Sequence, residues 1–350
     1  MGRIPSGREE LAMQTYAAID LHSNNGVLTI IDESDRVLKQ RRIANKLELF
    51  VEELEPFRAT LQGVAVESTF NWYWLVDGLR ARNLPVVLVN TAAIQQYEGL
   101  KRSDDQYDSW WLAHMMRLGI LPKGYIYPRE ERAVRDLLRK RATLVQQRTA
   151  NILSVQNLEA RNRGTRITAN EVKHLTGACI AELYENEDLA LALSTTLNVI
   201  NALTEQTRIL ERAVLRKARL RREFKLLLTV WGIGEILGLT IMYEAGDMSR
   251  FPSPGDFASY CRCVDASRLS NGKKKADNNA KNGNKYLAWA FVEAAHFAIR
   301  FYPQAKRFYD RKAAKTNNVV AIKAIAHKLA RAAFHVLREQ QPFDPNKVFV

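Results

Sequence analysis

The chain has 350 residues, of which 47% are hydrophobic and 26% charged, with only 17 glycines and 10 prolines. This composition excludes a disordered or collagen-like chain and suffices for two or three domains that each bury a core. The formal net charge is +14, and residues 261–350 alone carry 18 basic and 6 acidic side chains. Because a basic block attracts polyanions, we expect this part of the chain to contact nucleic acid or an anionic membrane surface.

The three cysteines cannot form a disulfide framework, and none has zinc-site spacing to another cysteine or to a histidine. No run approaches the roughly 18 apolar residues that a membrane-spanning helix needs. The start of the chain is too polar for a signal peptide, and Met13 directly precedes the first strand-like run. Residues 1–13 are therefore interpreted either as a dispensable leader or as the result of a late choice of start site. We therefore expect a cytoplasmic protein with no membrane partner.

The first predicted domain, 14–125, has an α/β pattern. Its expected elements are a two-strand hairpin, a strand, a helix, a strand, a helix and a strand, at 15–32, 37–44, 46–54, 62–66, 72–82 and 85–89. Helices resume near Thr91. Three meandering strands followed by alternating helices and strands predict a mixed sheet.

Long helical stretches with almost no glycine or proline fill the next segment, 126–222. Apolar residues recur there at spacings of three and four in two seams. The seams are Leu138, Ala142, Val145, Thr149 and Ile152, and Leu193, Leu197, Ile200, Leu203, Thr207, Leu210 and Val214. Helices of this kind pack as an antiparallel pair in one chain or against a partner chain. The spacing supports two interpretations equally, an intramolecular spacer and a dimerising coiled coil.

The segment 223–310 is predicted to be mainly helical, and 311–350 to be a basic helical tail. Gly232 and Gly234 stand between two apolar helical runs and predict a helix-hairpin-helix-like turn. Glycines there would let backbone amides approach a phosphate closely. A tight turn between two packed helices is an equally good interpretation of these glycines.

Four acidic residues occupy positions where ligands gather. Asp20 ends the first strand, Glu67 ends a later one, and Asp105 and Asp108 open a helix on one of its faces. Four carboxylates from three elements can hold two Mg²⁺ ions, one for the attacking and one for the leaving oxygen of a phosphodiester. A single such residue is more often a turn former or a helix cap. The order strand-Asp, strand-Glu, helix-DxxD is nevertheless that of ribonuclease-H-like nucleases, and the DxxD spacing favours Asp105 over the adjacent Asp104.

These residues carry a family resemblance. The stretch 101–113, KRSDDQYDSWWLA, resembles the K-x-x-D-x-x-D-x-x-x-L-A helix of the DEDD transposases, the Piv/MooV-like recombinases of bacterial insertion sequences. Residues 16–32 and 63–79 resemble the first two acidic blocks of that family, and 257–295 resembles its second signature. The residues of this second signature are most similar to those of the "eleven-eleven" branch of the "one-ten" family. The resemblance implies a ribonuclease-H-like (RuvC-like) first domain and a mainly helical, serine-bearing transposase domain at 223–310.

A serine precedes the Gly/Lys-rich part of that second signature. Counting back from Gly283 places Ser270 in the signature position, with Ser267 as the nearby alternative. No histidine base stands beside it, so a hydrolase triad is not supported, and the residues alone favour a basic loop that contacts DNA. The resemblance implies instead that this serine is the covalent nucleophile. The expected nucleic-acid contacts are Lys273, Lys274, Lys275, Lys281, Asn284, Lys285, Gly232 and Gly234.

The resemblance also implies the reaction and its partners. They are a DNA transposase or site-specific recombinase with a phosphoserine intermediate, Mg²⁺ at the four carboxylates, donor and target DNA, and a guiding bridge RNA. The chain would act as a homodimer that assembles into a tetramer, with the helices of 126–222 at the contact. Two rival interpretations remain. One is a metal-dependent junction or single-strand nuclease in which Ser270 only contacts DNA, and the other is a non-catalytic nucleic-acid-binding protein.

Overall fold

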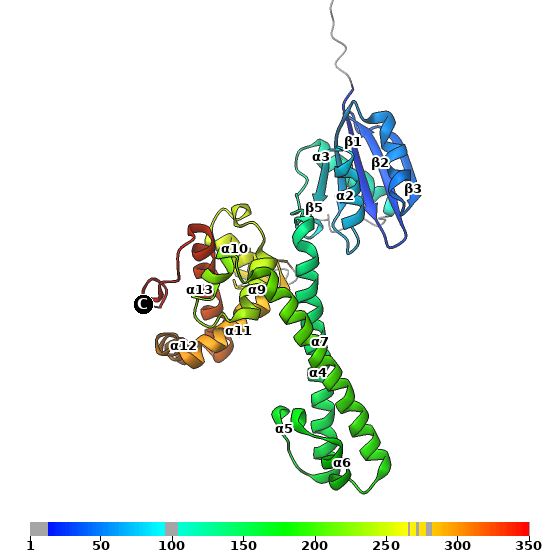
Figure 1. Ribbon diagram of the computed structural model, residues 1–350. Helices are drawn as coiled ribbons and strands as arrows, with labels where there is room; N and C mark the ends of the chain where they lie inside the picture. The colour runs from blue at the N-terminus through cyan, green and yellow to red at the C-terminus, as the bar shows by residue number, and fades with distance from the viewer. Residues whose placement is uncertain (1–12, 95–103, 265–266, 271–272, 278–281, 350) are drawn as a thin grey trace, which may run out of the picture. The chain divides into compact units, whose positions relative to one another are not determined.

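The computed structural model describes residues 13–94, 104–264, 267–270, 273–277 and 282–349 (Figure 1). The chain divides into two compact units, Met1–Arg129 and Glu130–Val350. Among the described residues, no helix combines the length and apolar character that crossing a membrane requires. The division of the second unit near residues 222 and 310 stays a prediction.

The first unit is built on a five-stranded sheet in the order β3-β2-β1-β4-β5. The strands are β1 (Thr15–Leu21), β2 (Asn25–Asp32), β3 (Val37–Ala44), β4 (Leu61–Glu67) and β5 (Val86–Val89). The helices are α1 (Leu47–Leu54), α2 (Tyr73–Ala81) and α3 (Asp105–Arg117), with short 3-10 turns at Glu55–Phe57 and Thr91–Ala93. β2 runs antiparallel to β1 and β3, while β4 is parallel to β1 and β5. This mixed α/β unit confirms the predicted sheet and is consistent with a ribonuclease-H-like fold.

Side chains alternate between the two faces of this sheet because successive strand residues point in opposite directions. Ile19 and Val66 pack with α1 and α2 in one core. Ala18 and Ala65 pack with α3 in another. The sheet is therefore covered on both faces, and α3 packs against the face on which the even-numbered residues of β1 lie.

The second unit is mostly helical. Its helices are α4 (Arg129–Arg163), α5 (Ala169–His174), α6 (Gly177–Leu183), α7 (Glu187–Ala218), α8 (Arg222–Leu227), α9 (Glu235–Ala245), α10 (Pro254–Tyr260), α11 (Lys285–Phe301), α12 (Pro303–Lys315) and α13 (Asn318–Glu339). Short 3-10 turns lie at Met248–Arg250 and Pro345–Lys347, and a two-stranded antiparallel sheet pairs β6 (Ser267–Ser270) with β7 (Lys273–Asp277).

The long helices α4 and α7 pack side by side in opposite directions (Figure 1). Arg141 of α4 pairs with Glu211, and Arg148 donates to Thr204, so the α7 numbers fall as those of α4 rise. Apolar residues of both predicted seams share one core at the far end of the pair. Thr149 is exposed, and its neighbour Arg148 takes its place in the contact. The pairing is thus intramolecular, and the dimerising role of these helices stays a prediction.

The main core of the second unit lies among α8 to α13. Phe257 of α10 and Phe291 of α11 are fully buried there, at edge-to-face geometry with ring centroids 6.1 Å apart. Trp231, between α8 and α9, stacks on Tyr302 and on Phe349. The residues that follow α13 are therefore packed onto the body of this unit.

Candidate active site

Two acidic residues meet at one edge of the first unit's sheet. β1 and β4 are parallel and pair Ile19 with Val66, so Asp20 and Glu67 each come one residue further along. Because Ile19 and Val66 face α1 and α2, the alternation of the strands turns Asp20 and Glu67 toward α3. Asp20 is only 5% exposed. The sheet therefore delivers two carboxylates to the same face, as their positions at the strand ends predict.

The helix α3 brings the other two carboxylates to this face. Asp104 is its N-cap, and its side chain accepts a backbone hydrogen bond from the first turn, so the helix begins at Asp105. Asp105 and Asp108 are three residues apart and share one face. A buried hydrogen bond of 2.7 Å between Thr29 of β2 and Ser109 fixes the helix on the sheet. Asp104 has the capping role and Asp105 faces the site, in agreement with the DxxD spacing.

His22 lies between the sheet and α3 in the middle of these acids. Its Nε2 is 3.2 Å from Oδ2 of Asp20 and 3.3 Å from Oδ2 of Asp105. The side chains of Asn45 and Asn71 both donate to its backbone oxygen, at 3.0 and 2.8 Å. These two side chains therefore hold the backbone from which the imidazole extends.

Arg42 of β3 neutralises one of the carboxylates. Its Nη2 is 2.6 Å from Oδ2 of Asp105, and its Nη1 donates to Asn25 at 2.8 Å. The hydrogen bond from Arg42, together with the nearby His22, holds the pKa of Asp105 below its ordinary value, although burial acts in the opposite direction. Asp105 therefore stays ionised well into the acidic range.

Glu67 has the opposite electrostatic environment. Burial, a hydrogen bond with Asp20, and the negative charges of Asp20 and Asp108 together raise the pKa of Glu67 to about 8. The carboxylates of Asp20, Glu67 and Asp108 repel one another when all three are charged, so Glu67 holds its proton more tightly than an isolated glutamate does. A positive charge placed among them would remove this repulsion.

The donor atoms in this cluster suit a divalent cation. Asp20, His22 and Asp105 each offer one atom, and these atoms all lie within 4.8 Å of one another. The His22 Nε2 is buried, and among the described residues no group makes a hydrogen bond to it with acceptable geometry. Carboxylate oxygens are the ligands of Mg²⁺, while an imidazole nitrogen also suits Mn²⁺ and other transition metals. The residues therefore fit a metal ion of this class.

Ser270 is the last residue of β6 in the second unit. It pairs with Lys273 at the start of β7, and residues 271 and 272 lie outside the described residues. Lys273, Lys274 and Lys275 belong to β7, and Lys281 lies outside the described part. The described part of the expected loop thus contains two short antiparallel strands, and the serine is the last residue of the first one.

Comparison with known families bears on both parts of the chain. Residues 17–158 match a model of the IS110-type DEDD transposases that is described as "Transposase". Residues 224–310 match the "Transposase IS116/IS110/IS902 family". The two models together span about two thirds of the chain. The chain belongs to the IS110 family of transposases.

One curated relative is the "Insertion element IS110 uncharacterized 43.6 kDa protein" of Streptomyces coelicolor, which is 22% identical over 152 residues. The match covers 43% of this chain and 38% of that relative, so the chain aligns with well under half of the relative's length. Family membership therefore rests on the two family models.

Two residues of this transposase-family chain were missed by sequence reasoning. His22 stands two residues after Asp20, a spacing that places both on one face of a strand, and this was the one available signal. Arg42 lies on β3 and reaches Asp105 only because β2 folds back between β1 and β3. Its sequence position, 63 residues before its partner, gave no signal.

Asn284, one of the expected nucleic-acid contacts, caps α11. Its side-chain oxygen accepts from the backbone N–H of Tyr286 and Leu287, and its Nδ2 donates to Oε2 of Glu244 at 2.7 Å. Glu244 is buried in α9 and also receives two hydrogen bonds from Arg139, at 2.7 and 2.8 Å. Both ends of the Asn284 carboxamide are therefore engaged within the transposase, where they hold the chain that leaves the serine hairpin.

The two glycines of the predicted helix-hairpin-helix-like turn differ in their surroundings. Gly232 has φ +81°, and a Cβ there would lie 2.1 Å from the backbone oxygen of Ala294 in α11. Gly234 is the exposed N-cap of α9, with open space around a Cβ. Gly232 therefore serves the close approach of two segments, while Gly234 leaves the helix N-terminus open. Lys285, the first residue of α11, is exposed.

Proposed function

We propose that this protein is a DNA transposase that cleaves and rejoins DNA with its four-carboxylate site and with Ser270. One observation carries the proposal. In a chain of the transposase family, Asp20, Glu67 and α3 bring their carboxylates together at one edge of a mixed sheet. The mutual repulsion of Asp20, Glu67 and Asp108 opposes folding, so packing does not account for their meeting. Their chemical use, binding of divalent metal and phosphate, supports a role in phosphodiester chemistry.

Mg²⁺ is the proposed metal, held by Asp20, Glu67, Asp105 and Asp108. When bound, it would lower the cost of negative charge on the reacting phosphate and its neighbouring oxygens. His22 is placed to join these ligands or to orient Asp20 and Asp105 through its Nε2. Arg42 leaves the ligand set less negative because it pairs with Asp105.

Ser270 is the proposed nucleophile. In the proposed step its oxygen forms a bond to phosphorus, its proton leaves to a base, and the displaced DNA oxygen departs and takes up a proton. One phosphate ester bond to DNA is broken and one to serine is formed, so the number of ester bonds does not change. The hydroxyl of a second DNA end can then displace the serine without an external energy source. The position of Ser270 at the end of β6, paired with Lys273 of the lysine-bearing β7, supports this role.

The proposed substrates are the donor and target DNA of an insertion element, with an element-encoded bridge RNA that selects them by base pairing. Protein contacts would then read backbone and shape while the RNA reads sequence. The active form would be a dimer that assembles into a tetramer. These statements rest on the family resemblance, and the excess of basic residues after residue 260 supports nucleic-acid binding.

The test is covalent trapping on full-length protein. The protein is purified with co-purified RNA, incubated with donor and target DNA and Mg²⁺, and run on denaturing gels. We expect a protein–DNA adduct that is lost in Ser270→Ala, lost after RNase treatment and retained in Ser267→Ala, the matched control on the same strand. An adduct that persists in Ser270→Ala and disappears in Ser267→Ala would move the nucleophile to Ser267. Asp20→Asn should abolish the adduct in the same assay.

A metal-dependent nuclease is the second candidate. It is favoured by one observation, namely that all the carboxylates of the site belong to the first unit, which does not contain the serine. Cleavage that survives in Ser270→Ala and leaves no adduct would establish the nuclease. DNA binding that is the same in the parent and Asp20→Asn, with no cleavage by either, would leave a non-catalytic binding protein.

A further inference from the structure

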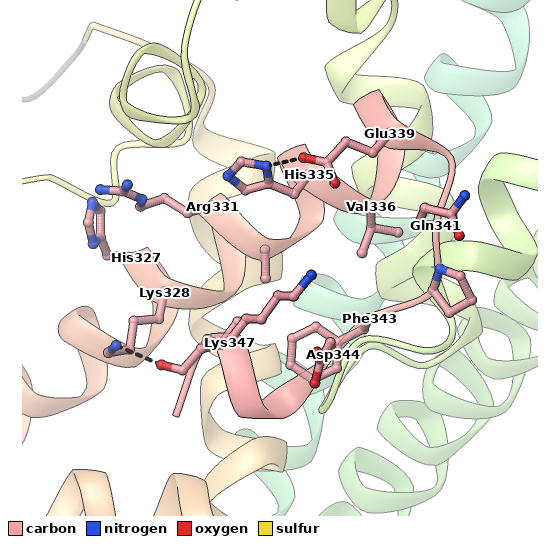
Figure 2. Close-up of a pocket in the computed structure, with 13 residues that line it drawn as sticks. His327, Lys328, Arg331, His335, Val336, Glu339, Gln341, Phe343, Asp344 and Lys347 are labelled. Carbon is pink, nitrogen blue, oxygen red and sulfur yellow. Dashed lines mark hydrogen bonds and ion pairs between the residues drawn. The ribbon is translucent and has the colours of Figure 1, made fainter. Parts of the chain in front are cut away.

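A hollow in the second unit lies outside the residues of the proposed reaction (Figure 2). We call it the α13 pocket, and it is bounded by α13 and by residues 341–348. Its volume is about 780 Å³, which falls in the range of ligand-binding pockets. Gln340 has φ +54° and ends α13 in a left-handed turn, which sends the chain back along the helix. The two walls therefore come from consecutive parts of the chain.

The second wall of the α13 pocket is fixed by packing. The Phe343 N–H donates to the hydroxyl of Thr229 at 2.9 Å, and the Phe343 ring meets Trp231 edge to face. Phe349 also stacks on Trp231, which is itself stacked on Tyr302. These contacts hold residues 343–349 against the helical core, so we expect the pocket to be formed before any ligand binds.

Basic and imidazole side chains line the helix wall at regular spacing. His327, Arg331 and His335 follow one another at intervals of four residues and so share one face of α13. Lys328 lies beside them, and Lys347 faces them from the second wall. Figure 2 shows the Arg331 guanidinium beside His327, and Lys347 extended into the hollow. Basic and imidazole side chains therefore line the pocket from both walls.

Two carboxylates line the pocket together with these groups, Glu339 and Asp344. Glu339 is paired with His335 at 2.6 Å, and in the part of the chain that the structure describes neither Arg331 nor Lys347 forms an ion pair with a carboxylate. Burial and the neighbouring Arg331 lower the pKa of Lys328. Burial, Arg331 and Lys328 likewise lower the pKa of His327. The cations repel one another, and an anion in the pocket would relieve that repulsion.

We propose that the α13 pocket binds a phosphate of a single nucleic acid strand through residues that the proposed reaction does not use. Arg331 and Lys347 would contact the phosphate oxygens, and the ring of Phe343 offers a surface on which an adjoining base can stack. A single strand fits because a duplex is too wide to enter a hollow of this volume, whereas one nucleotide fits into it. That the phosphate belongs to nucleic acid rests on the proposed function, while the choice of an anion rests on the pocket alone.

The test combines binding with a footprint on the full-length protein. Fluorescent single-stranded DNA and RNA of one sequence, about 20 nucleotides long, are titrated in EDTA and followed by anisotropy. Arg331→Gln removes the central cation from an exposed position, where the fold does not depend on it. Arg216→Gln removes the same charge from an exposed position on α7 and is the matched control. We expect roughly tenfold weaker binding for Arg331→Gln, less than about twofold for Arg216→Gln, and recovery in Arg331→Lys.

The location is checked by acetylating lysines with and without the strand. We expect the strand to protect Lys347, and the more strongly protecting of the two strands identifies the pocket as a DNA or an RNA site. Equal affinities of Arg331→Gln and Arg216→Gln, or an unprotected Lys347, would overturn the proposal. Protection by adenosine monophosphate as strong as that by the strand would also overturn it and leave a site for small phosphate compounds.

This outcome is separable from that of the proposed function, because binding in EDTA needs no metal and no cleavage. A protein that protects Lys347 but neither cuts DNA nor forms an adduct would overturn the recombinase and leave the α13 pocket standing. A protein that forms the Ser270 adduct while Lys347 stays unprotected would overturn the pocket alone.

Discussion

Arg139 is the basic partner of a buried carboxylate, and its replacement by methionine should destabilise the second unit. Glu244 is 1% exposed and receives two hydrogen bonds from Arg139 and one from Asn284. Removing one partner of a buried ion pair costs about 3–5 kcal/mol, because the remaining charge is left without compensation. Asn284 still donates to Glu244 in the variant, so we expect the lower end, about 3 kcal/mol.

The size of this effect is easily measured. A loss of about 3 kcal/mol in the free energy of unfolding is roughly a 100-fold change in the unfolding equilibrium and lowers the midpoint of a unit of this size by about 6–12 °C. Urea and thermal unfolding, followed by far-ultraviolet circular dichroism, give both quantities. Hydrogen exchange should also quicken at the first amides of α11, because Asn284 caps that helix and depends on Glu244 for its position.

The matched control is Arg141→Met on the same helix. Arg141 pairs with Glu211, whose side chain is 30% exposed, so the unpaired carboxylate would be hydrated and the loss should stay below about 1 kcal/mol. The double variant Arg139→Met/Glu244→Gln removes the uncompensated charge and should recover at least half of the lost stability. Equal losses for Arg139→Met and Arg141→Met would refute the reasoning, because burial would then have no effect on the cost.

Three further outcomes are expected. Gly232→Ala should destabilise the second unit by about 3 kcal/mol or more in urea unfolding, because its Cβ would clash with the α11 backbone at a positive φ, whereas Gly234→Ala has open space and should change little. Asp35 is half-buried, and although burial raises its pKa, hydrogen bonds led by that from Arg117 hold the pKa below its ordinary value. The charged Asp35 carboxylate therefore stabilises the fold above about pH 4, and this stabilisation is lost as the pH falls through the lowered pKa. The parent and Asp35→Asn should differ in their free energies of unfolding at pH 7 and converge in acid. Mg²⁺ or Mn²⁺ at about 100 times its Kd should stabilise the first unit by about 2.7 kcal/mol in a tryptophan-fluorescence melt, and Asp20→Asn should lose this shift; an unchanged shift would remove Asp20 from the ligands.

Strand alternation made much of the first unit predictable. The β-rich runs from Thr15 to Asp32 were separated by a Ser-Asn-Asn-Gly turn, and the structure has two paired strands there. Asp20 and Glu67 were predicted at strand ends, and the parallel pairing of β1 with β4 brings them together. The hairpin and the strand-end positions of the two acids depend on local sequence, which is why sequence reasoning reached them, whereas the pairing of β1 with β4 joins distant segments.

Other features depend on contacts that local sequence does not encode. The strands β6 and β7 are polar and lack an alternating apolar pattern, so the sequence predicts a basic loop where the structure has two paired strands. Arg42 joined the site through the order of the strands. Asn284 matched a family signature, but its partner Glu244 lies 40 residues earlier in an apolar helix where a carboxylate gave no sign of its role.

The order of the elements along the chain has a consequence for synthesis on the ribosome. All five strands of the first sheet are complete at Val89, yet the helix that covers its second face begins only at Asp105. During that interval the apolar surface around Ala18 and Ala65 is bare, and such faces drive association between nascent chains. Asp20 and Glu67 lie on this face, and while it is open to water both carboxylates are hydrated and charged. Charged residues on an otherwise apolar face oppose such association, so we expect the acidic cluster to limit aggregation in the interval before α3 covers the face.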